Sequence, residues 1–564
     1  GFRVDQESQT TMKLLLTSVF GPFGVDDKYV RRLNVMELFH NQVTREQGIF
    51  SLRINHPSFG LYLIAENLEI PTVVLDFPSL EQFEAEVKKG YEYIGISSIV
   101  ANIAKVKKMT EVIRKHSPGT KIIIGGHCTN IPHIENLVDY DHLSVGEGIS
   151  WFRRLLGEAD KPIRHPAIRS TMNRKIMGIP LPNTAAVLIP GLGCINACSF
   201  CATSHHFGKK YIGYMETGKE VYQQMQAIEK RIGSDEFFVM DENFLKSRQR
   251  AEELLFEMER DKKYYYMGVF SSAETVKAVG VEFLVKLGID FIWIGVESKR
   301  HVFAKTKGVN LNEMIDELRS FGIQVLGSAI LFLDHHDKET IQEDIDFAID
   351  LNTDFLQFMN LGPLPGTALY QETEAAGKLR MDLPYSEWHG QDRIWFRHEH
   401  FSAEESSVYL KNAFIEDYTR QGPSILRLAL TSLRGYRTVR EHNDPRIHGL
   451  TERLRKRCTE FRPILQAARR FAENKRTIEM LDYLESEFEK EFGTLSAVDK
   501  IVSSLAVFLS TLEHKRLKQD GYMPQPSTRR VAYRLPWYEP FLDSASLMGG
   551  LNRLFNLQDI RREC

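Results

Sequence analysis

Three closely spaced cysteines are the part of the sequence with the most evident chemistry. Cys194, Cys198 and Cys201 follow an apolar run and lie in a loop flanked by Gly193 and Gly208. Thiolates are the protein ligands of iron–sulfur clusters, and glycines let the backbone fold closely around an inorganic cube. Three thiolates would leave one iron of a four-iron cube open for another ligand.

A zinc ion is the alternative occupant of this loop. Zinc closes a tetrahedron of four ligands, and the fourth could come from His205 or His206, just after the cysteines. No fourth cysteine lies nearby. We therefore favour the iron–sulfur cluster.

The spacing Cys-x-x-x-Cys-x-x-Cys, with Phe200 before the last cysteine, resembles the signature of the radical S-adenosylmethionine (SAM) superfamily. In that family the amino and carboxylate groups of SAM chelate the open iron of a [4Fe-4S] cluster. One electron then cleaves SAM to methionine and a 5′-deoxyadenosyl radical, which abstracts hydrogen from substrate. The resemblance implies an external electron donor such as flavodoxin or ferredoxin.

The resemblance continues through residues 185–370 and implies a set of SAM-binding residues. Most of them end successive predicted strands, in the order in which that family places its SAM contacts. The set is Phe200, Asp241, Glu242, Asn243, Ser271, Ser272, Glu274, Gly295, Glu297, Pro363 and Pro365. A single acidic residue at a strand end is more often a helix cap than a ligand, so the ordered series carries the assignment.

Two adjacent histidines, His335 and His336, follow another predicted strand. As catalytic residues they would handle protons or bind substrate. The equally weighted alternative is that Asp334 and Asp337 cap the next helix and that the histidines are merely exposed.

The elements that must position these residues begin with five apolar strand patterns separated by helical ones. The strands are expected at 13–20, 72–77, 93–98, 121–126 and 141–146, with helices such as 61–68 and 103–116 between them. This alternation predicts a doubly wound, Rossmann-like α/β domain over residues 12–160, with its ligands at the carboxyl ends of the strands. Residues 1–11 are interpreted as a tag remnant or tail, and residues 161–184 as a connector.

The alternation then resumes and predicts a second α/β unit. Strands are expected at 186–190, 237–241, 266–271, 291–297, 324–332 and 355–361. Six such repeats over residues 185–400 indicate a partial (β/α)6 barrel, a partial TIM barrel, whose chemistry lies at the carboxyl rim of its strands. From 401 to 564 only helical patterns occur, among them 404–420, 451–475 and 495–518, which predicts an all-α C-terminal domain.

A doubly wound domain ahead of a radical SAM barrel resembles the cobalamin-binding (B12-binding) branch of the superfamily. Glycines and small hydroxyls at strand ends would let the backbone approach a flat macrocycle or its nucleotide tail. The residues implied are Ser58, Phe59, Gly60, Ser97, Ser98, Ile99, Gly125, Gly126, His127, Gly146, Glu147 and Gly148. No Asp-x-His-x-x-Gly follows the first strand, so we expect water or a residue of the 97–102 loop on the lower face of cobalt.

A methylthiotransferase would have the same domain order. That family holds a second cluster with three further cysteines in its N-terminal domain, whereas this chain has only Cys128 there. It also tends to end in a small β domain, where this chain shows helical patterns. We therefore disfavour this interpretation.

The leading functional hypothesis is a cobalamin-dependent radical SAM methyltransferase acting on an unactivated carbon of a small-molecule or lipid-like substrate. One alternative keeps both cofactors and performs a cyclisation, ring contraction or carbon–carbon coupling. The other keeps the radical SAM barrel and uses the N-terminal domain only as a binding module. Trp388, His389, Gln391 and Trp395 are candidate substrate-facing residues.

Composition limits the partners and the cellular location that we expect for this protein. The chain is 43% hydrophobic and 26% charged, as in ordinary globular proteins, and its net charge of −3 gives no overall attraction to nucleic acid. No membrane-length apolar run or signal peptide is evident, so we expect a cytoplasmic protein. Basic residues outnumber acidic ones over 427–476, and the apolar pattern at 501–512 suits a helical core, with contact to a membrane surface or lipid as the alternative.

Overall fold

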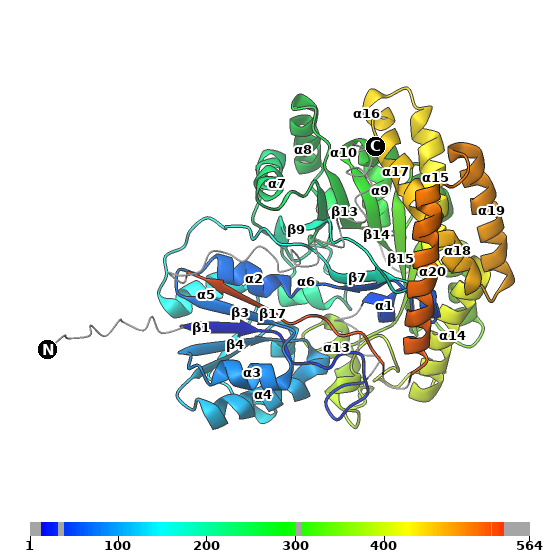
Figure 1. Ribbon diagram of the computed structural model, residues 1–564. Coiled ribbons are helices and arrows are strands. Elements are labelled where there is room, and N and C mark those ends of the chain that lie inside the picture. The colour runs from blue at the N-terminus through cyan, green and yellow to red at the C-terminus, as the bar shows by residue number, and fades with distance from the viewer. Residues whose placement is uncertain (1–12, 32–38, 301–305, 520–521, 535–564) are drawn as a thin grey trace.

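The computed structural model describes residues 13–31, 39–300, 306–519 and 522–534 (Figure 1). The expected tail, residues 1–11, lies outside them. An N-terminal sheet has the strand order β17-β3-β1-β4-β5-β6, and all its strands except β17 run parallel. These parallel strands are β1 (Leu14–Thr17), β3 (Thr72–Asp76), β4 (Tyr93–Ser97), β5 (Lys121–Gly125) and β6 (His142–Ser144). The order reverses between β1 and β4, the usual ligand position in such sheets.

Helices cover both faces of this sheet. One face packs against α2 (Phe59–Glu66) and α5 (Gly148–Leu156). The other packs against α3 (Leu80–Val87) and α4 (Ile103–His116). The sheet is therefore buried on both sides, which explains why its strands read as continuous apolar runs.

The second unit is a six-stranded parallel sheet in the order β16-β15-β14-β13-β12-β9. Its strands are β9 (Ala186–Leu188), β12 (Glu236–Val239), β13 (Tyr266–Ser271), β14 (Ile289–Glu297), β15 (Gln324–Leu331) and β16 (Phe355–Asn360). Among the described residues β9 and β16 do not pair with each other, so the curved sheet is open. The mixed α/β class with parallel sheets is confirmed.

Local signals start and stop the helices on the outer face of this sheet. These helices are α7 (Gly218–Ile232), α8 (Arg248–Arg260), α9 (Ala273–Val279), α10 (Val281–Leu287), α11 (Leu311–Ser320) and α12 (Thr340–Asp350). Thr217 and Glu220 form a capping box at the start of α7, and Gly233 ends it in the left-handed conformation.

The C-terminal region is helical as far as residue 517. Its main helices are α14 (Ala403–Gln421), α15 (Ser424–Arg440), α17 (Thr451–Phe461), α18 (Leu465–Arg470), α19 (Lys475–Phe492) and α20 (Ala497–Leu517). The expectation of helices alone is wrong for β17 (Arg529–Tyr533), which pairs antiparallel with β3. Without β17, β3 would be a sheet edge with unpaired backbone groups, and Arg530 strengthens the attachment through an ion pair with Glu86 at 2.9 Å.

Two segments do not follow the expected division of the chain. Residues 161–184, expected as a connector, contain β7 (Met172–Ile176) and β8 (Ile179–Pro180), which form a small sheet with β2 (Arg53–Asn55). Several apolar side chains of residues 39–52 pack in a cluster with α15, α18 and α19. Residues 39–55 thus lie with the C-terminal helices, although their sequence position suggested the N-terminal domain.

No described helix combines the length and apolar character needed to cross a lipid bilayer.

Candidate functional site

The three cysteines lie between β10 (Gly191–Leu192) and the short helix α6 (Ala202–His206). Each is partly exposed, and none of the three forms a disulfide. Gly193, at φ +80°, is required here because a Cβ on it would approach the Lys210 carbonyl oxygen to 2.3 Å. Ser204 Oγ donates to the Cys194 carbonyl at 2.6 Å. Within the loop, Cys194 Sγ also accepts from the Asn196 N–H at 3.5 Å.

The geometry favours a cluster over a single zinc ion. Zinc–sulfur bonds of about 2.3 Å would bring the thiolates within about 3.8 Å of one another, but the three sulfurs are not among the described groups whose ligand atoms all lie within 4.8 Å. His205 Nδ1 lies 2.9 Å from the Cys201 carbonyl oxygen, and its Nε2 accepts from the Ala368 N–H. His206 Nδ1 is 3.2 Å from Asn130 Nδ2. Both histidines therefore have other partners.

Two consecutive carboxylates at the end of β12 have different surroundings. Asp241 is buried and receives Arg250 Nη2 and the Tyr211 hydroxyl, each at 2.8 Å. Glu242 instead has a buried oxygen, Oε2, without a hydrogen-bond partner. Burial raises the pKa of Glu242 to about 7, although a Gly193 N–H bond opposes the rise. Glu242 therefore suits a bound cation, whereas Asp241 already has one in Arg250.

Glu242 also influences the cysteine loop. The pKa of Cys194 is raised, first by burial and further by the negative charges of Cys201 and Glu242. The carboxylate and the thiol thus lie close enough to interact electrostatically. A ligand that carries an ammonium group and reaches the open iron would bring a positive charge close to Glu242 and Cys194. That charge would oppose the rise in both pKa values.

The remaining polar SAM candidates form a network at the ends of β12 and β13. Ser271 Oγ donates to Asn243 Oδ1 at 3.2 Å, and Asn243 Nδ2 donates to Ser272 Oγ at 3.3 Å. All three are buried. Glu274 lies at the start of α9 and forms an ion pair with Lys246 at 2.8 Å.

Other SAM candidates lie around the same rim. Glu297 ends β14 with φ +58°, next to an irregularity in strand register that follows Gly295. The Pro363 carbonyl accepts from the Trp395 indole at 3.1 Å, in the loop that also contains Pro365. Phe200 packs against the barrel core. A left-handed backbone is costly for a glutamate, which marks the end of β14 as a constrained position.

At the carboxyl edge of the N-terminal sheet, the residue after β5 must be a glycine because its neighbours leave no room for a side chain. A Cβ on Gly126 (φ +83°) would lie 2.5 Å from the Ser98 carbonyl oxygen and 3.2 Å from Ser97 Oγ. His127 follows it with a buried Nδ1 that has no partner, and burial lowers its pKa to about 4. His127 is a neutral side chain with one unused ring nitrogen.

Several cobalamin candidates have structural tasks instead. Ser58 binds Asp76 through both its N–H and its hydroxyl, Glu147 caps α5 and accepts from Tyr214, and a Cβ on Gly148 would clash with Ile64 at 2.6 Å. Each of these contacts would be needed without any ligand.

The cysteine loop meets this edge directly. Helix α6 lies against the 3₁₀ turn η3 (His127–Asn130) that follows β5. The rings of His206 on α6 and His127 have their centroids 4.7 Å apart. The barrel rim and the carboxyl edge of the N-terminal sheet therefore face each other across these two histidines.

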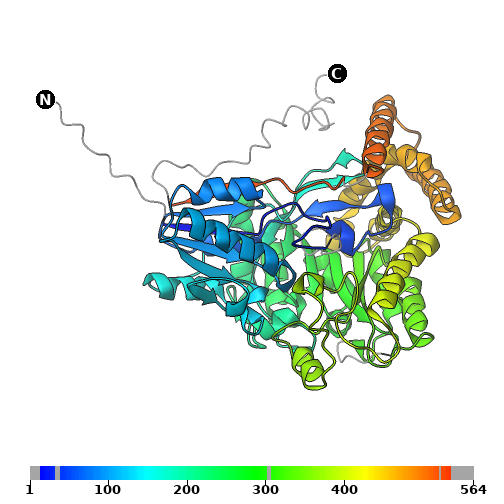
Figure 2. The same cartoon turned by 90° about the horizontal axis from the view of Figure 1, so that it is seen from below.

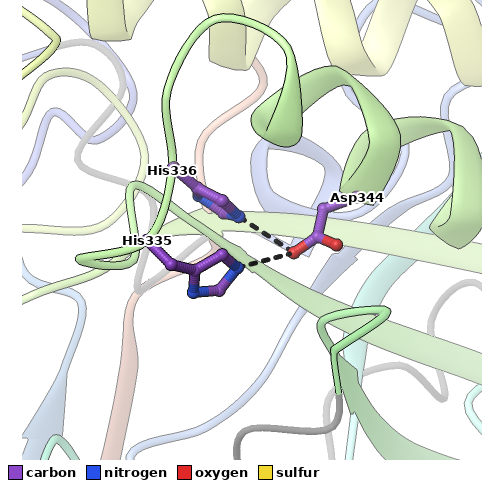
Figure 3. A group of neighbouring side chains, drawn as sticks. All are labelled: His335, His336 and Asp344. Atoms are coloured by element: carbon purple, nitrogen blue, oxygen red, sulfur yellow. Dashed lines mark hydrogen bonds and ion pairs between the residues drawn. The ribbon is translucent and has the colours of Figure 1, made fainter.

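His335, His336 and Asp344 form the one group among the described residues whose ligand atoms are close enough for a metal ion (Figure 3). His336 Nδ1 accepts from the Leu333 N–H at 3.1 Å, so the ring proton must lie on Nε2, which donates to Asp344 at 2.9 Å. A proton on Nε2 leaves no lone pair there for a metal. His336 is fully buried, so we assign it the task of joining the loop after β15 to α12.

A group of buried polar atoms at the end of β16 was partly missed by sequence reasoning. His389 and Gln391 were expected near substrate, but Arg45 and Asn360 were not, because their sequence neighbourhoods carry no motif. Atoms without a hydrogen-bond partner there are Asn360 Oδ1, His389 Nε2 and Gln391 Oε1, and Arg45 Nε lies beside them in an ion pair with Glu46 at 3.5 Å. Buried polar atoms almost always have partners, so a concentration of exceptions indicates missing water or ligand.

Contacts join these residues into one group. Arg45 Nη1 donates to the Gln391 carbonyl at 2.8 Å, and Asn360 Nδ2 donates to the Asp392 carbonyl at 2.8 Å. Trp388 and Trp395, which flank the group in sequence, are buried in the core of the N-terminal domain. These tryptophans therefore join the two domains and are not exposed to a substrate.

Comparisons with known proteins agree with this geometry. Residues 188–348 match the Radical SAM superfamily. These residues include the cysteine loop and most of the barrel. Its fold resembles the radical SAM methyltransferase TsrM from Kitasatospora setae, solved with cobalamin and a [4Fe-4S] cluster, with a TM-score of 0.51 and 14% identity over 80% of this chain and 99% of that one. This likeness agrees with the expected mixed α/β fold with parallel sheets.

Two curated relatives are methyltransferases. The chain is 26% identical over 257 residues to an uncharacterized methyltransferase of Pyrococcus horikoshii, covering 45% of this chain and 54% of the relative. It is 24% identical over 314 residues to bacteriochlorophyllide d C-12(1)-methyltransferase of Chlorobaculum tepidum, covering 50% and 66%. The match to the first of these relatives thus spans only about half of that relative's length.

Proposed function

We propose that this chain is a cobalamin-dependent radical SAM enzyme that methylates an unactivated carbon of a small-molecule or lipid-like substrate. The observation that carries the proposal is the contact of α6 with η3, because it sets the cluster loop against the sheet edge where a doubly wound domain binds its ligand. The methyltransferase names of the two curated relatives support the same reaction class.

Cys194, Cys198 and Cys201 would hold the [4Fe-4S] cluster. When bound, SAM supplies a 5′-deoxyadenosyl radical and cobalamin supplies the methyl group. Glu242, in its anionic form, pairs with the ammonium group of SAM, and its unpartnered Oε2 supports this role. The network of Asn243, Ser271 and Ser272 offers hydroxyl and amide groups to the rest of the molecule.

Asp241 has a different task from the one its sequence position suggested. Its carboxylate neutralises Arg250 and orients the turn through the Asn243 N–H. It therefore positions Glu242 and Asn243 without touching SAM.

The cobalamin site fits the sheet edge at Ser97, Ser98, Gly125, Gly126 and His127. The unpartnered Nδ1 of His127 offers a polar contact to a ligand placed there. Burial keeps the ring neutral at physiological pH, so it can accept or donate a hydrogen bond according to its tautomer.

We infer that the unpartnered atoms at the end of β16 bind the polar group of the substrate. Because His389 Nδ1 lies 3.4 Å from the Gln391 N–H as acceptor, the ring proton belongs on Nε2. That proton is a donor, whereas Asn360 and Gln391 offer carbonyl oxygens. A hydroxyl or amide group, which both donates and accepts, would satisfy such a set.

The test is product analysis after anaerobic reconstitution with iron, sulfide, cobalamin, SAM and a reductant. Methyl transfer predicts 5′-deoxyadenosine and S-adenosylhomocysteine together with a substrate gain of one methyl group. Deoxyadenosine without S-adenosylhomocysteine in the presence of substrate would indicate a cyclisation or coupling. If the reconstituted protein shows no corrinoid absorption, the N-terminal domain does not hold cobalamin and serves only as a binding module. Flavodoxin or ferredoxin is the expected electron donor, and the cytoplasm the expected location.

A further inference from the structure

An arginine cluster lies at the amino end of the barrel, where its strands begin. Arg453 and Arg457 on α17 both donate through Nη2 to Asp290 Oδ2, each at 2.8 Å. Arg453 Nη2 also donates to Glu236 Oε1 at 3.0 Å. Glu236 is the first residue of β12, and Asp290 is the second residue of β14. The SAM candidates lie at the opposite, carboxyl end of these strands, where such barrels carry out their chemistry.

Arg174 on β7 lies beside these two arginines. The Leu181 N–H donates to the Arg174 carbonyl at 2.9 Å, and three residues further on the Thr184 hydroxyl donates to Glu236. Burial lowers the pKa of Arg174, the charge of Glu236 opposes this shift, and the charge of Arg457 adds to it. Arg174 is thus close enough to interact with both. Figure 2 shows the hairpin of β7 and β8 beside α20, apart from the N-terminal sheet.

Three N–H groups of this cluster are buried without a hydrogen-bond partner. They are those of Arg174 Nε, Arg453 Nε and Arg457 Nη1. Buried polar atoms almost always have partners, and all three of these groups are donors. Guanidinium groups donate in a planar fork that matches the oxygens of phosphate and carboxylate groups. The missing partner is therefore an acceptor, and an oxyanion has the matching geometry.

The charges of the cluster also favour an anion. Three guanidinium groups lie near two carboxylates, those of Glu236 and Asp290. Ion pairs join these carboxylates to α17, whereas none joins Arg174 to a carboxylate of the described residues. The next negative charge is on Glu460, but its side chain is 66% exposed and its ion pair is with Lys456 at 4.0 Å. One positive charge thus lacks a counter-ion, and a water molecule would not neutralise it.

We propose that Arg174, Arg453 and Arg457 form a binding site for a small oxyanion with the size and charge of phosphate. The oxyanion would accept from the three unpartnered N–H groups and balance the charge of Arg174. It would also join β7 to α17 at the start of the barrel strands. The site lies away from the carboxyl rim and does not depend on the proposed function.

Equilibrium dialysis of the full chain against radiolabelled inorganic phosphate, at an ionic strength held constant with sodium chloride, tests the proposal. Wild type should bind phosphate at this site with one phosphate per chain. Arg174→Gln should weaken that binding about tenfold or more, because it removes a charge-assisted hydrogen bond. Arg434→Gln is the matched control, since Arg434 is 40% exposed and pairs with Asp316 elsewhere on the surface. It should leave phosphate binding unchanged.

Thermal unfolding without phosphate checks that Arg174→Gln folds. Its midpoint should not fall below that of wild type, because the variant removes a buried charge that has no ion pair.

Glu460→Gln tests the site from the opposite direction. The charges of Arg453 and Arg457 act on the pKa of Glu460, so its carboxylate competes with a bound anion for them. Removing that negative charge should tighten phosphate binding several-fold, and weaker binding would overturn the proposal. A wild-type chain that binds no phosphate, or equal binding by wild type and Arg174→Gln, would overturn it as well.

Discussion

Asp241 and Arg250 form a buried ion pair with 2.8 Å between Oδ2 and Nη2, and their side chains are only 2% and 4% exposed. The next residue, Glu242, has no such cation and keeps one buried oxygen without a partner. The two adjacent carboxylates thus have different surroundings, because they lie in the turn that follows β12 and meet different neighbours there.

Asp241→Asn should destabilise the fold. The variant leaves the Arg250 charge buried without its counter-ion, which typically costs about 3–5 kcal/mol. Chemical denaturation followed by circular dichroism measures the change in the free energy of unfolding. An unfolding curve that overlays wild type would contradict the structural role of Asp241.

Glu242→Gln should weaken SAM binding while largely preserving stability. It removes the one negative charge available to the SAM ammonium group, a loss of about tenfold or more in affinity for a charge-assisted hydrogen bond. Equilibrium dialysis with SAM on the cluster-loaded protein measures it. Asp241→Asn, where it folds, is the control and should bind SAM more nearly like wild type; the reverse ranking would exchange the roles of the two residues.

Replacing Cys194, Cys198 or Cys201 with alanine should abolish the cluster and SAM cleavage. Two thiolates do not satisfy the three cysteine-bound irons of a cluster of this type. Iron content and 5′-deoxyadenosine formation report the loss, and cobalamin absorption should persist because its expected site lies on the other domain. The control is Cys458→Ser, a buried thiol among the C-terminal helices. SAM cleavage by any of the three alanine variants would refute the assignment.

His336→Phe should lower stability without changing metal content. The change leaves the Leu333 N–H without its acceptor and removes one of the hydrogen bonds that the Asp344 carboxylate accepts, and an unsatisfied buried group costs about 1–3 kcal/mol. Thermal unfolding and elemental analysis are the measurements. His335→Ala serves as the comparison, as His335 is partly exposed. Loss of a zinc ion from both variants would restore the metal-site interpretation.

Stability should fall as the pH is lowered from about 6.5 to 4, the window set by the pKa of His165. Its Nε2 accepts from the Ile189 N–H and its Nδ1 lies 2.8 Å from the Pro166 carbonyl, while burial lowers its pKa to about 4. In that window the unfolded chain takes up a proton that the folded chain does not, which removes about 3 kcal/mol. Above about pH 6.5 the contribution is fully present.

Denaturation of His165→Gln across the same range should show a shallower loss. Burial lowers the pKa of His127 and His389 to about 4 as well, so some slope should remain in the variant. An identical slope in wild type and variant would show that His165 does not titrate as described.

The sequence by itself determined the cysteine triplet, its resemblance to the radical SAM signature and the strands that carry the rim residues. These features are local: a motif is read within a few residues, and a strand buried on both faces shows as an apolar run. The same local patterns placed Glu242 and Asn243 at a strand end. They could not tell which carboxylate Arg250 neutralises.

Only the tertiary structure decided what depends on contacts between distant segments. The sequence did not predict β17 after the last helix. This segment becomes a strand because it pairs with the open edge of β3. Arg45 joins His389 and Gln391 only because residues 39–52 pack away from the domain that precedes them in sequence. His336 and Glu147 belong to motifs that suggested chemistry, yet their partners make them structural. A side chain's task is fixed by which atoms satisfy it, and those atoms come from the whole fold.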